Sequence, residues 1–264
     1  MTELFPFGPA ARRATMMFDA LAGSAASTGI LLDVDGTLSP IVARPELAEL
    51  AARARPVLSS LVGRYRVVAA ISGRTVDQLE RLVDVAGVKL VGSYGLATGP
   101  VPADVISAVF ALSDEVEGAW VETKGSTIAV HYRASPDGDA AGGVLEERLG
   151  ALADPAGMAL VPGKRVVELV PAGMPLKEAV VDRIIEEEGL RAALYAGDDV
   201  ADLRAFEALD RAQEDGRLEH AVKVAVRGVE TPDDLVPAAD VVVDDPAGMV
   251  ELLAWLSSLR PGEA

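Results

Sequence analysis

Two aspartates one position apart follow the apolar stretch in "ILLDVDGTLSPI", residues 30–41. Asp33 and Asp35 would repel each other in a dry interior, and a shared divalent cation is the simplest explanation for keeping both. Gly36 allows a sharp turn, and Thr37 can offer a hydroxyl and a backbone N–H to a ligand. An ordinary strand-to-loop exit, with Asp35 or Thr37 as a cap, is the alternative. The pattern favours a divalent-cation site directly after a strand.

A second acidic cluster lies in "LYAGDDVADLRAF", residues 194–206, where an apolar run leads into a predicted helix. Asp198, Asp199 and Asp202 fall within the first turn of that helix. The helix dipole favours carboxylates there, so the cluster alone is equally consistent with a structural role. Together with the first pair of aspartates, it supplies the oxygen ligands that Mg²⁺ prefers.

Two polar residues lie between the acidic clusters. Ser72 follows the apolar run of "AAISGR", and Lys177 lies early in a predicted helix within "PLKEAV". Ser72 can donate a hydrogen bond to a phosphate oxygen, and Lys177 can neutralise its charge. Taken singly, a turn serine and a solvated lysine are the simpler interpretations. A phosphate-binding role is favoured by the order of the motifs along the chain, which is Asp-x-Asp, Ser, Lys and Gly-Asp-Asp. Each motif falls at a strand end or a helix start.

Short apolar runs must position these residues, and they alternate with longer helical stretches. Because the runs are continuously apolar, we predict strands buried on both faces, as in a parallel sheet. The predicted strands are 29–34, 66–72, 88–93, 192–197, 221–226 and 239–244, and the predicted helices are 10–22, 45–62, 76–87, 175–189 and 246–259. This alternation predicts an α/β fold with a doubly wound, mainly parallel sheet. Ligands bind beyond the carboxyl ends of such strands, where both acidic clusters fall.

The middle of the chain does not follow this alternation of strands and helices. Residues 119–133 and 158–171 each indicate two strands around a turn, and residues 102–118 and 137–153 indicate helices. These elements predict a small α+β unit with an antiparallel sheet.

The spacing of the motifs shows where this unit is inserted. Only 37 residues separate Asp35 from Ser72, whereas 105 residues separate Ser72 from Lys177. We therefore predict a core domain at 1–96 and 174–264, and an inserted cap domain at 97–173. A cap at this place can close over the strand ends, exclude water and contact the leaving group.

Bulk composition limits the partners. The chain has 264 residues, 50% of them hydrophobic, with a formal net charge of -17 and a pI near 4.5. Nucleic acid and an anionic membrane surface are therefore not expected partners. Without cysteine there is no disulfide framework or thiolate metal site. No apolar run is long enough to span a bilayer and no signal peptide is recognised, so we expect a cytoplasmic protein, and a monomer rather than an oligomer.

The four ordered motifs resemble those of the haloacid dehalogenase-like phosphatase superfamily, over roughly 28–97 and 174–264. The resemblance implies that Asp33 is the nucleophile that takes the phosphoryl group. It implies that Asp35 protonates the leaving alcohol and then activates the water that hydrolyses the aspartyl phosphate. The implied phosphate-binding residues are Thr37, Ser72 and Lys177. The implied Mg²⁺ ligands are Asp33, the Asp35 carbonyl and Asp198, with Asp199 and Asp202 in support.

Three segments resemble the trehalose-6-phosphate phosphatase family more specifically: "ETKGSTIAVHYR", "GKRVVELVP" and "YAGDDVADLRAF". In that family a Glu-x-Lys pair, a His-x-Arg pair and a further glutamate bind the sugar hydroxyls. Carried over, these are Glu122, Lys124, His131, Arg133 and Glu168. Residues two apart on a strand share a face, so each pair can point into one cleft. A solvated sheet with alternating polar residues is the alternative, and Trp120 and Tyr132 are expected to be packing residues.

Three positions depart from the family pattern. Tyr94 stands where the family usually has histidine, Glu178 follows Lys177 where glycine is usual, and Ala201 replaces a threonine. None removes a catalytic group, and all bear on sugar selectivity.

Three functions therefore stay open. The first is a Mg²⁺-dependent phosphatase that converts trehalose 6-phosphate, a small-molecule substrate, to trehalose. The second is a phosphatase for another sugar phosphate, such as sucrose phosphate or mannosylphosphoglycerate. The third is a non-catalytic sensor of a phospho-sugar. Intact Asp33 and Asp35 argue against the sensor, since a pure binder does not need the acid/base residue.

Overall fold

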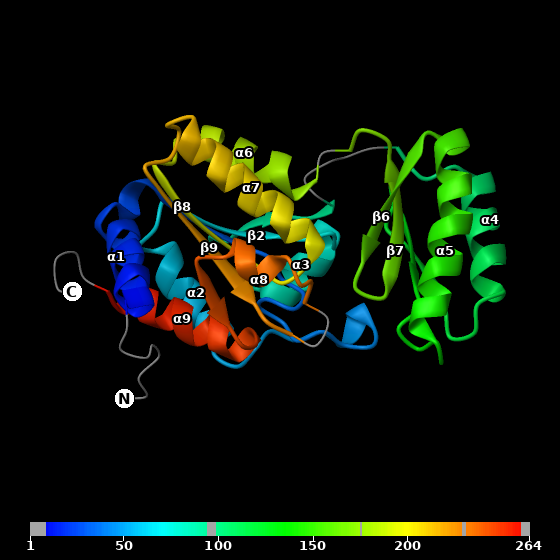
Figure 1. Cartoon of the computed structure of the whole chain (residues 1–264), viewed down its shortest axis with the longest axis horizontal. Helices are drawn as coiled ribbons and strands as arrows, with labels where there is room; N and C mark the ends of the chain where they lie inside the picture. Colours follow the sequence, from blue (N-terminus) through cyan, green and yellow to red (C-terminus); the bar gives the residue numbers. More distant parts are fainter. Residues whose placement is uncertain (1–8, 94–98, 175, 229–230, 260–264) are drawn as a thin grey trace. The chain divides into compact units, whose positions relative to one another are not determined.

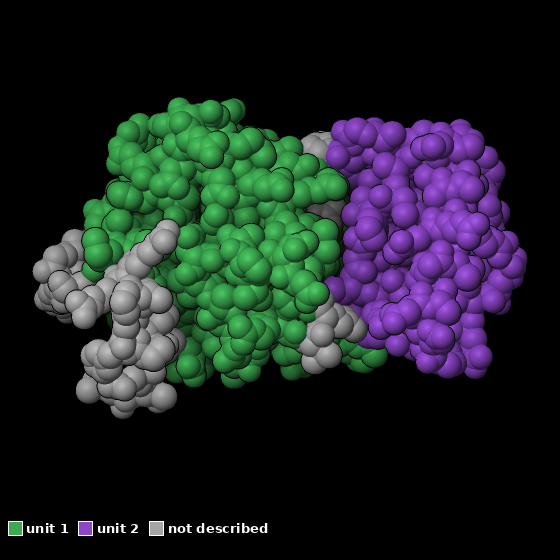
Figure 2. All heavy atoms as spheres, in the orientation of Figure 1, with its two compact units in different colours: residues 1–94, 176–264 green, residues 95–175 purple. Residues whose placement is uncertain are grey.

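The computed structural model describes residues 9–93, 99–174, 176–228 and 231–259. The chain divides into two compact units, which are residues 1–94 with 176–264 and residues 95–175 (Figure 2). The first unit contains a parallel sheet and the second an antiparallel one. The predicted α/β fold with an inserted α+β unit is confirmed.

Six parallel strands form the sheet of the first unit, in the order β10-β9-β8-β1-β2-β3 (Figure 1). Their bounds are β1 Thr28–Leu32, β2 Val67–Ile71, β3 Lys89–Val91, β8 Ala192–Gly197, β9 His220–Val226 and β10 Val241–Val243. Every residue of β1, β2 and β8 is buried. Continuous apolar runs at the centre of the sheet are therefore explained by burial on both faces.

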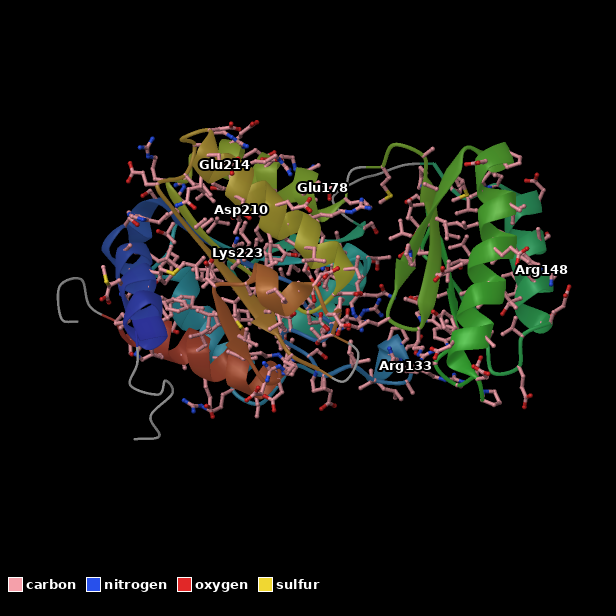
Figure 3. All side chains as sticks on the ribbon, in the orientation of Figure 1. Arg133, Arg148, Glu178, Asp210, Glu214 and Lys223 are labelled. Carbon is pink, nitrogen blue, oxygen red and sulfur yellow. The ribbon has the colours of Figure 1, made fainter. Side chains whose placement is uncertain are left out.

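Helices cover both faces of this sheet, with α1, α2 and α9 on one face and α6 and α7 on the other (Figure 1). Their bounds, with two further helices, are α1 Pro9–Gly23, α2 Ala54–Val62, α3 Val76–Val83, α6 Lys177–Glu188, α7 Val200–Glu214, α8 Leu235–Ala238 and α9 Pro246–Ser258. Lys223 of β9 ties α7 to the sheet, because its Nζ lies 2.7 and 2.9 Å from the carboxylate oxygens of Asp210 (Figure 3). None of the described helices is long and apolar enough to cross a bilayer.

The predicted helix over residues 45–62 is wrong in its first half. A short 3-10 turn, η2, covers Pro45–Leu47, and α2 begins only at Ala54. Pro56 lacks a backbone N–H, and its ring would clash with the carbonyl four residues earlier, so it is tolerated only in the first turn of a helix. Arg53, with φ 68°, takes the left-handed conformation directly before α2, which interrupts any continuous helix.

The second unit has four antiparallel strands in the order β4-β5-β7-β6 and two main helices. Their bounds are α4 Ala103–Asp114, β4 Trp120–Thr123, β5 Ile128–His131, α5 Gly138–Ala153, β6 Met158–Gly163 and β7 Val166–Pro171. Val130 and Val167 share a core with Val109 of α4 and Leu145 of α5, so the helices cover one face of the sheet. The Arg148 guanidinium of α5 also pairs with a glutamate at the end of α4 (Figure 3).

Candidate active site

The carboxyl edge of the parallel sheet brings together residues from three strands. Asp33 directly follows β1, and its backbone N–H donates to the carbonyl of Ala196 in β8 at 2.9 Å. Ser72 directly follows β2, and its N–H donates to the carbonyl of Val91 in β3 at 3.0 Å. Asp198 directly follows β8. Because strand pairing continues to the last residue of each strand, these polar side chains are fixed at one edge of the sheet.

Lys177 is the first residue of α6 and places its ammonium between two buried carboxylates. Its Nζ donates to Asp33 Oδ1 and to Asp202 Oδ1, each at 2.6 Å. Lys177 is 4% exposed, Asp33 5% and Asp202 0%. Charges this far from water are stable only when they are paired and hydrogen-bonded, so each of these three groups depends on the other two.

The start of α7 is fixed by the second acidic cluster. Asp202, in the first turn, accepts hydrogen bonds at Oδ2 from the backbone N–H groups of Asp198 and Asp199, each at 2.9 Å. Asp199 is the N-cap of α7, and its Oδ1 accepts from the N–H of Val200 at 2.6 Å. Asp199 and Asp202 also form a capping box, because the Asp199 side chain accepts from the backbone N–H of Asp202 while Asp202 accepts from that of Asp199. The structure therefore shows Asp199 and Asp202 as residues that hold the loop carrying Asp198.

Tyr195 joins this network, although the sequence analysis did not single it out. Its hydroxyl donates to Asp202 Oδ1 at 2.7 Å, and the whole side chain is buried. The signal that could have found Tyr195 is a hydroxyl within the otherwise apolar strand "AALYAG". A buried hydroxyl requires a hydrogen-bond partner.

The buried acidic group has more negative than positive charge. The carboxylates of Asp33, Asp198 and Asp202 each offer an oxygen within 4.8 Å of the others, and Lys177 is the ammonium among them. Burial raises the pKa of the Asp33 carboxyl well above its ordinary value; Lys177 lowers this pKa, and Asp202 and Asp198 raise it further. A metal ion could bind where these carboxylates meet, because its charge would offset their excess.

Gly36 allows the two acidic motifs to approach each other. Its φ is 88°, a conformation that favours glycine, and a Cβ at this position would lie 1.9 Å from Asp198 Oδ2. Any larger residue would push the Asp198 carboxylate away. The glycine of the Asp-x-Asp-Gly sequence is therefore explained by contact with the second acidic cluster.

Asp35 makes a two-point ion pair that the sequence analysis did not foresee. Arg74 Nε donates to Asp35 Oδ2 at 2.8 Å, and Arg74 Nη2 donates to Asp35 Oδ1 at 2.7 Å. Arg74 Nη1 also donates to the Pro45 carbonyl at 3.0 Å, and its backbone N–H donates to Ser72 Oγ at 3.1 Å. Arg74 stands two residues after Ser72 at the same strand end, and that position was the available signal.

Thr37 is a buried hydroxyl at the same edge. It is fully buried, and its Oγ1 makes no hydrogen bond to any residue that the structure describes. Leaving a buried hydroxyl unsatisfied costs free energy, and the oxygen of a bound phosphate would accept a hydrogen bond from it. Thr37 therefore fits the phosphate-binding role that the sequence suggested.

Four of the five predicted cap residues form one polar cluster in the second unit. His131 Nε2 lies 2.9 Å from Glu122 Oε2, and Lys124 Nζ lies 3.8 Å from Glu122 Oε2 and 3.5 Å from Glu168 Oε1. The Thr127 hydroxyl, not foreseen from the sequence, donates to Glu168 Oε1 at 2.5 Å. Glu122 and Glu168 both pair with Ala129 across the sheet, on the face opposite the helix-covered valines. The cluster is thus a connected set of donors and acceptors.

Arg133 is placed differently from the other four cap residues. It lies in the turn after β5, and its Nη2 donates to the carbonyl of Lys164 in the turn between β6 and β7 at 2.8 Å. Tyr132 belongs to the hydrophobic core of the unit, as predicted. Trp120 packs on His131, with the two rings nearly parallel and their centroids 4.1 Å apart.

The three departures from the family pattern have different surroundings. Tyr94 lies outside the described residues. Glu178 projects from α6 (Figure 3), and its Oε1 lies 3.8 Å from Arg204 Nη1 of α7. Ala201 follows the first residue of α7.

The parallel sheet with carboxylates at its edge and an inserted antiparallel unit defines a protein with the haloacid dehalogenase-like fold. A haloacid dehalogenase-like hydrolase from Bacteroides thetaiotaomicron has the same fold, with a TM-score of 0.58 and 15% identity over 87% of this chain and 99% of that one. The C-terminal domain of trehalose-6-phosphate phosphatase from C. albicans matches with a TM-score of 0.76 and 22% identity, over 92% and 96% of the two chains. The family model for trehalose-phosphatase matches residues 31–238, and the chain belongs to that family.

Two curated relatives differ in name and in how much of their length this chain covers. The trehalose-phosphate phosphatase of Mycobacterium avium is 31% identical over 93% of this chain and 66% of its own length. An uncharacterized glycosyl hydrolase of Mycobacterium tuberculosis is 35% identical over 68% of this chain. The chain spans only 15% of that protein.

Proposed function

We propose that this chain is a Mg²⁺-dependent phosphatase that hydrolyses trehalose 6-phosphate to trehalose and inorganic phosphate. The observation that carries the phosphatase activity is the buried pair of Asp33 and Lys177 beside Asp198, at the ligand-binding edge of the sheet. Burying such charges is costly, and here it places a nucleophile next to the positive charge that a phosphate requires.

In the first step, an Asp33 carboxylate oxygen attacks phosphorus, and the bond between phosphorus and the sugar oxygen breaks. Asp35 gives a proton to that oxygen, which leaves as an alcohol. Lys177, Thr37 and Ser72 donate hydrogen bonds to the phosphate oxygens and offset their charge. The product is a phosphoryl group bound covalently to Asp33.

In the second step, Asp35 takes a proton from a water molecule whose oxygen attacks phosphorus. The bond between phosphorus and Asp33 breaks, which releases inorganic phosphate and restores the carboxylate. An acyl phosphate is a mixed anhydride and is hydrolysed more readily than the original ester. One difficult reaction is thereby divided into two easier ones.

The donor set at the sheet edge suits a hard cation, because it consists of carboxylate and carbonyl oxygens. Mg²⁺ would be held by the carboxylates of Asp33 and Asp198 and the backbone carbonyl of Asp35, with Asp199 and Asp202 in support. When bound, it supplies positive charge that lowers the repulsion between a carboxylate nucleophile and an anionic ester.

Two observations support trehalose 6-phosphate as the substrate. One is the polar cluster of the second unit, here called the cap cluster, and the other is the names of the relatives. Glu122, Lys124, His131 and Glu168 offer charged donors and acceptors, which suit the many hydroxyls of a disaccharide. Arg133, which bonds a carbonyl here, is proposed as the fifth contact. The second candidate is another sugar phosphate, such as sucrose phosphate or mannosylphosphoglycerate, since these also present hydroxyls.

Phosphate release from a panel of sugar phosphates, measured with Mg²⁺ present, tests the proposal. We expect the highest kcat/KM for trehalose 6-phosphate, and no turnover by Asp33→Asn. Comparable values for all the sugar phosphates would contradict the trehalose assignment and leave a general phosphatase. No release from any ester, with binding retained, would instead indicate a sensor.

A further inference from the structure

The Asp202 carboxylate has no acceptor capacity left for a metal ion. An ionised carboxylate has about four lone-pair sites, and this one accepts four hydrogen bonds. They come from Lys177 and Tyr195 at Oδ1 and from two backbone N–H groups at Oδ2. Asp202 is also fully buried. A cation could reach either oxygen only by displacing one of these donors.

Tyr195 is a buried group that the proposed steps do not use. Its hydroxyl donates to Asp202 Oδ1 at 2.7 Å, and Lys177 donates to the same oxygen at 2.6 Å. Burial, with the nearby Asp202 charge, raises the pKa of the phenol well above its ordinary value, so the hydroxyl keeps its proton and remains a donor. The rigid strand β8 carries Tyr195, which fixes where Oδ1 can lie.

Lys177 in turn lies 2.6 Å from Asp33 Oδ1, so a chain of contacts runs from Tyr195 through Asp202 and Lys177 to the proposed nucleophile. We infer that Tyr195 and Asp202 are positioning residues that hold the Lys177 ammonium against Asp33, and that Asp202 is not a ligand of the divalent cation. This inference rests on the proposed function for the role of Lys177. Without the tyrosine hydroxyl, the Asp202 carboxylate can turn toward Lys177 and draw the ammonium away from the phosphate position.

Tyr195→Phe tests this with the full chain, because phenylalanine keeps the ring and removes only the hydroxyl. Hydrogen bonds to charged groups are the strong ones, so we expect kcat/KM to fall about tenfold. The Mg²⁺ dissociation constant, measured by calorimetry, should stay within about twofold of wild type. Tyr65→Phe is the matched control, since Tyr65 is buried in the same unit and its hydroxyl bonds the Leu256 carbonyl. This control should change neither quantity.

A double-mutant cycle shows whether the hydroxyl acts through Lys177. In a Lys177→Met background, we expect Tyr195→Phe to lower kcat/KM by less than about twofold, because the group being positioned is gone. A full tenfold loss in both backgrounds would overturn the inference. The inference would also be overturned if Tyr195→Phe weakened Mg²⁺ binding by as large a factor as it lowered kcat/KM. Asp202 would then act on the metal.

Binding of inorganic phosphate separates failure of this inference from failure of the proposed function. If the wild-type chain hydrolyses no phosphate ester, the proposed function fails, but the affinity for phosphate in Mg²⁺ can still be measured. Tyr195→Phe should weaken phosphate binding about threefold or more, relative to Tyr65→Phe. Equal affinities in the two variants would overturn the inference whether or not the chain turns over a substrate.

Discussion

Arg74 holds both carboxylate oxygens of Asp35, with Nε 2.8 Å from Oδ2 and Nη2 2.7 Å from Oδ1. Two parallel hydrogen bonds fix the plane of the carboxylate as well as its position. The residue proposed to give and take protons is thereby oriented by a neighbour from the adjacent strand end.

Arg74→Lys should therefore slow the step in which Asp35 protonates the leaving group. A lysine cannot make the two-point contact, and we expect a kcat lower by about tenfold on sugar phosphates. The loss should be much smaller for p-nitrophenyl phosphate, whose leaving group needs no proton. Arg55→Lys is the control, because among the described residues Arg55 bonds the backbone carbonyls of Val83 and Leu82 and no carboxylate. Equal losses on both substrates would show that Arg74 serves phosphate binding instead.

Asp198→Asn should remove most of the divalent-cation affinity. Losing one charged ligand is expected to weaken Mg²⁺ binding by about tenfold or more, measured by calorimetry. Ligand binding stabilises the folded state, so added Mg²⁺ should raise the Tm of the wild-type protein, and this rise should be lost in Asp198→Asn. Asp210→Asn, which alters a half-buried pair with Lys223 away from the acidic clusters, should keep the rise. A Tm that does not respond to Mg²⁺ in the wild type would contradict a metal site.

Glu122→Gln should weaken recognition of the sugar and leave recognition of the phosphate unchanged. The substitution weakens the contact with His131 Nε2 and removes a charge beside Lys124. We expect KM for trehalose 6-phosphate to rise about tenfold, while kcat/KM for p-nitrophenyl phosphate stays within about twofold. Arg148→Gln, on the helical side of the same unit, should change neither value. A matching loss on both substrates would mean that the cap cluster supports the fold and not the sugar.

Tyr65 should make the protein less stable in alkali. Burial raises the pKa of Tyr65 from 10.0 to about 12. Above pH 10 the unfolded chain releases this proton while the folded chain retains it, so the stabilising contribution present below pH 10 is lost as pH rises toward 12. Denaturant unfolding at pH 9 and pH 11.5 should show a smaller fall in the free energy of unfolding for Tyr65→Phe than for wild type. An identical fall in the free energy of unfolding for both proteins would contradict a raised pKa for Tyr65.

Much of the fold could be predicted because the signals are local. The apolar runs that become β1, β2 and β8 are buried on both faces, so their composition alone marks central parallel strands. Polar residues directly after those strands had to lie at one edge. The helix predicted over 45–62 failed because a single residue, Pro56, decides where α2 can begin.

The sequence by itself determined which candidate residues lie at strand ends or helix starts, since Asp33, Ser72 and Asp198 directly follow recognisable strands and Lys177 begins a helix. Only the tertiary structure decided which side chains meet. Asp33 and Lys177 are 144 residues apart, and Asp35 and Arg74 are 39 apart. The first contact depends on how α6 packs against the sheet edge, and the second on how the loops after β1 and β2 fold over that edge. Local residue patterns do not contain that information, because it arises from the packing of the whole core.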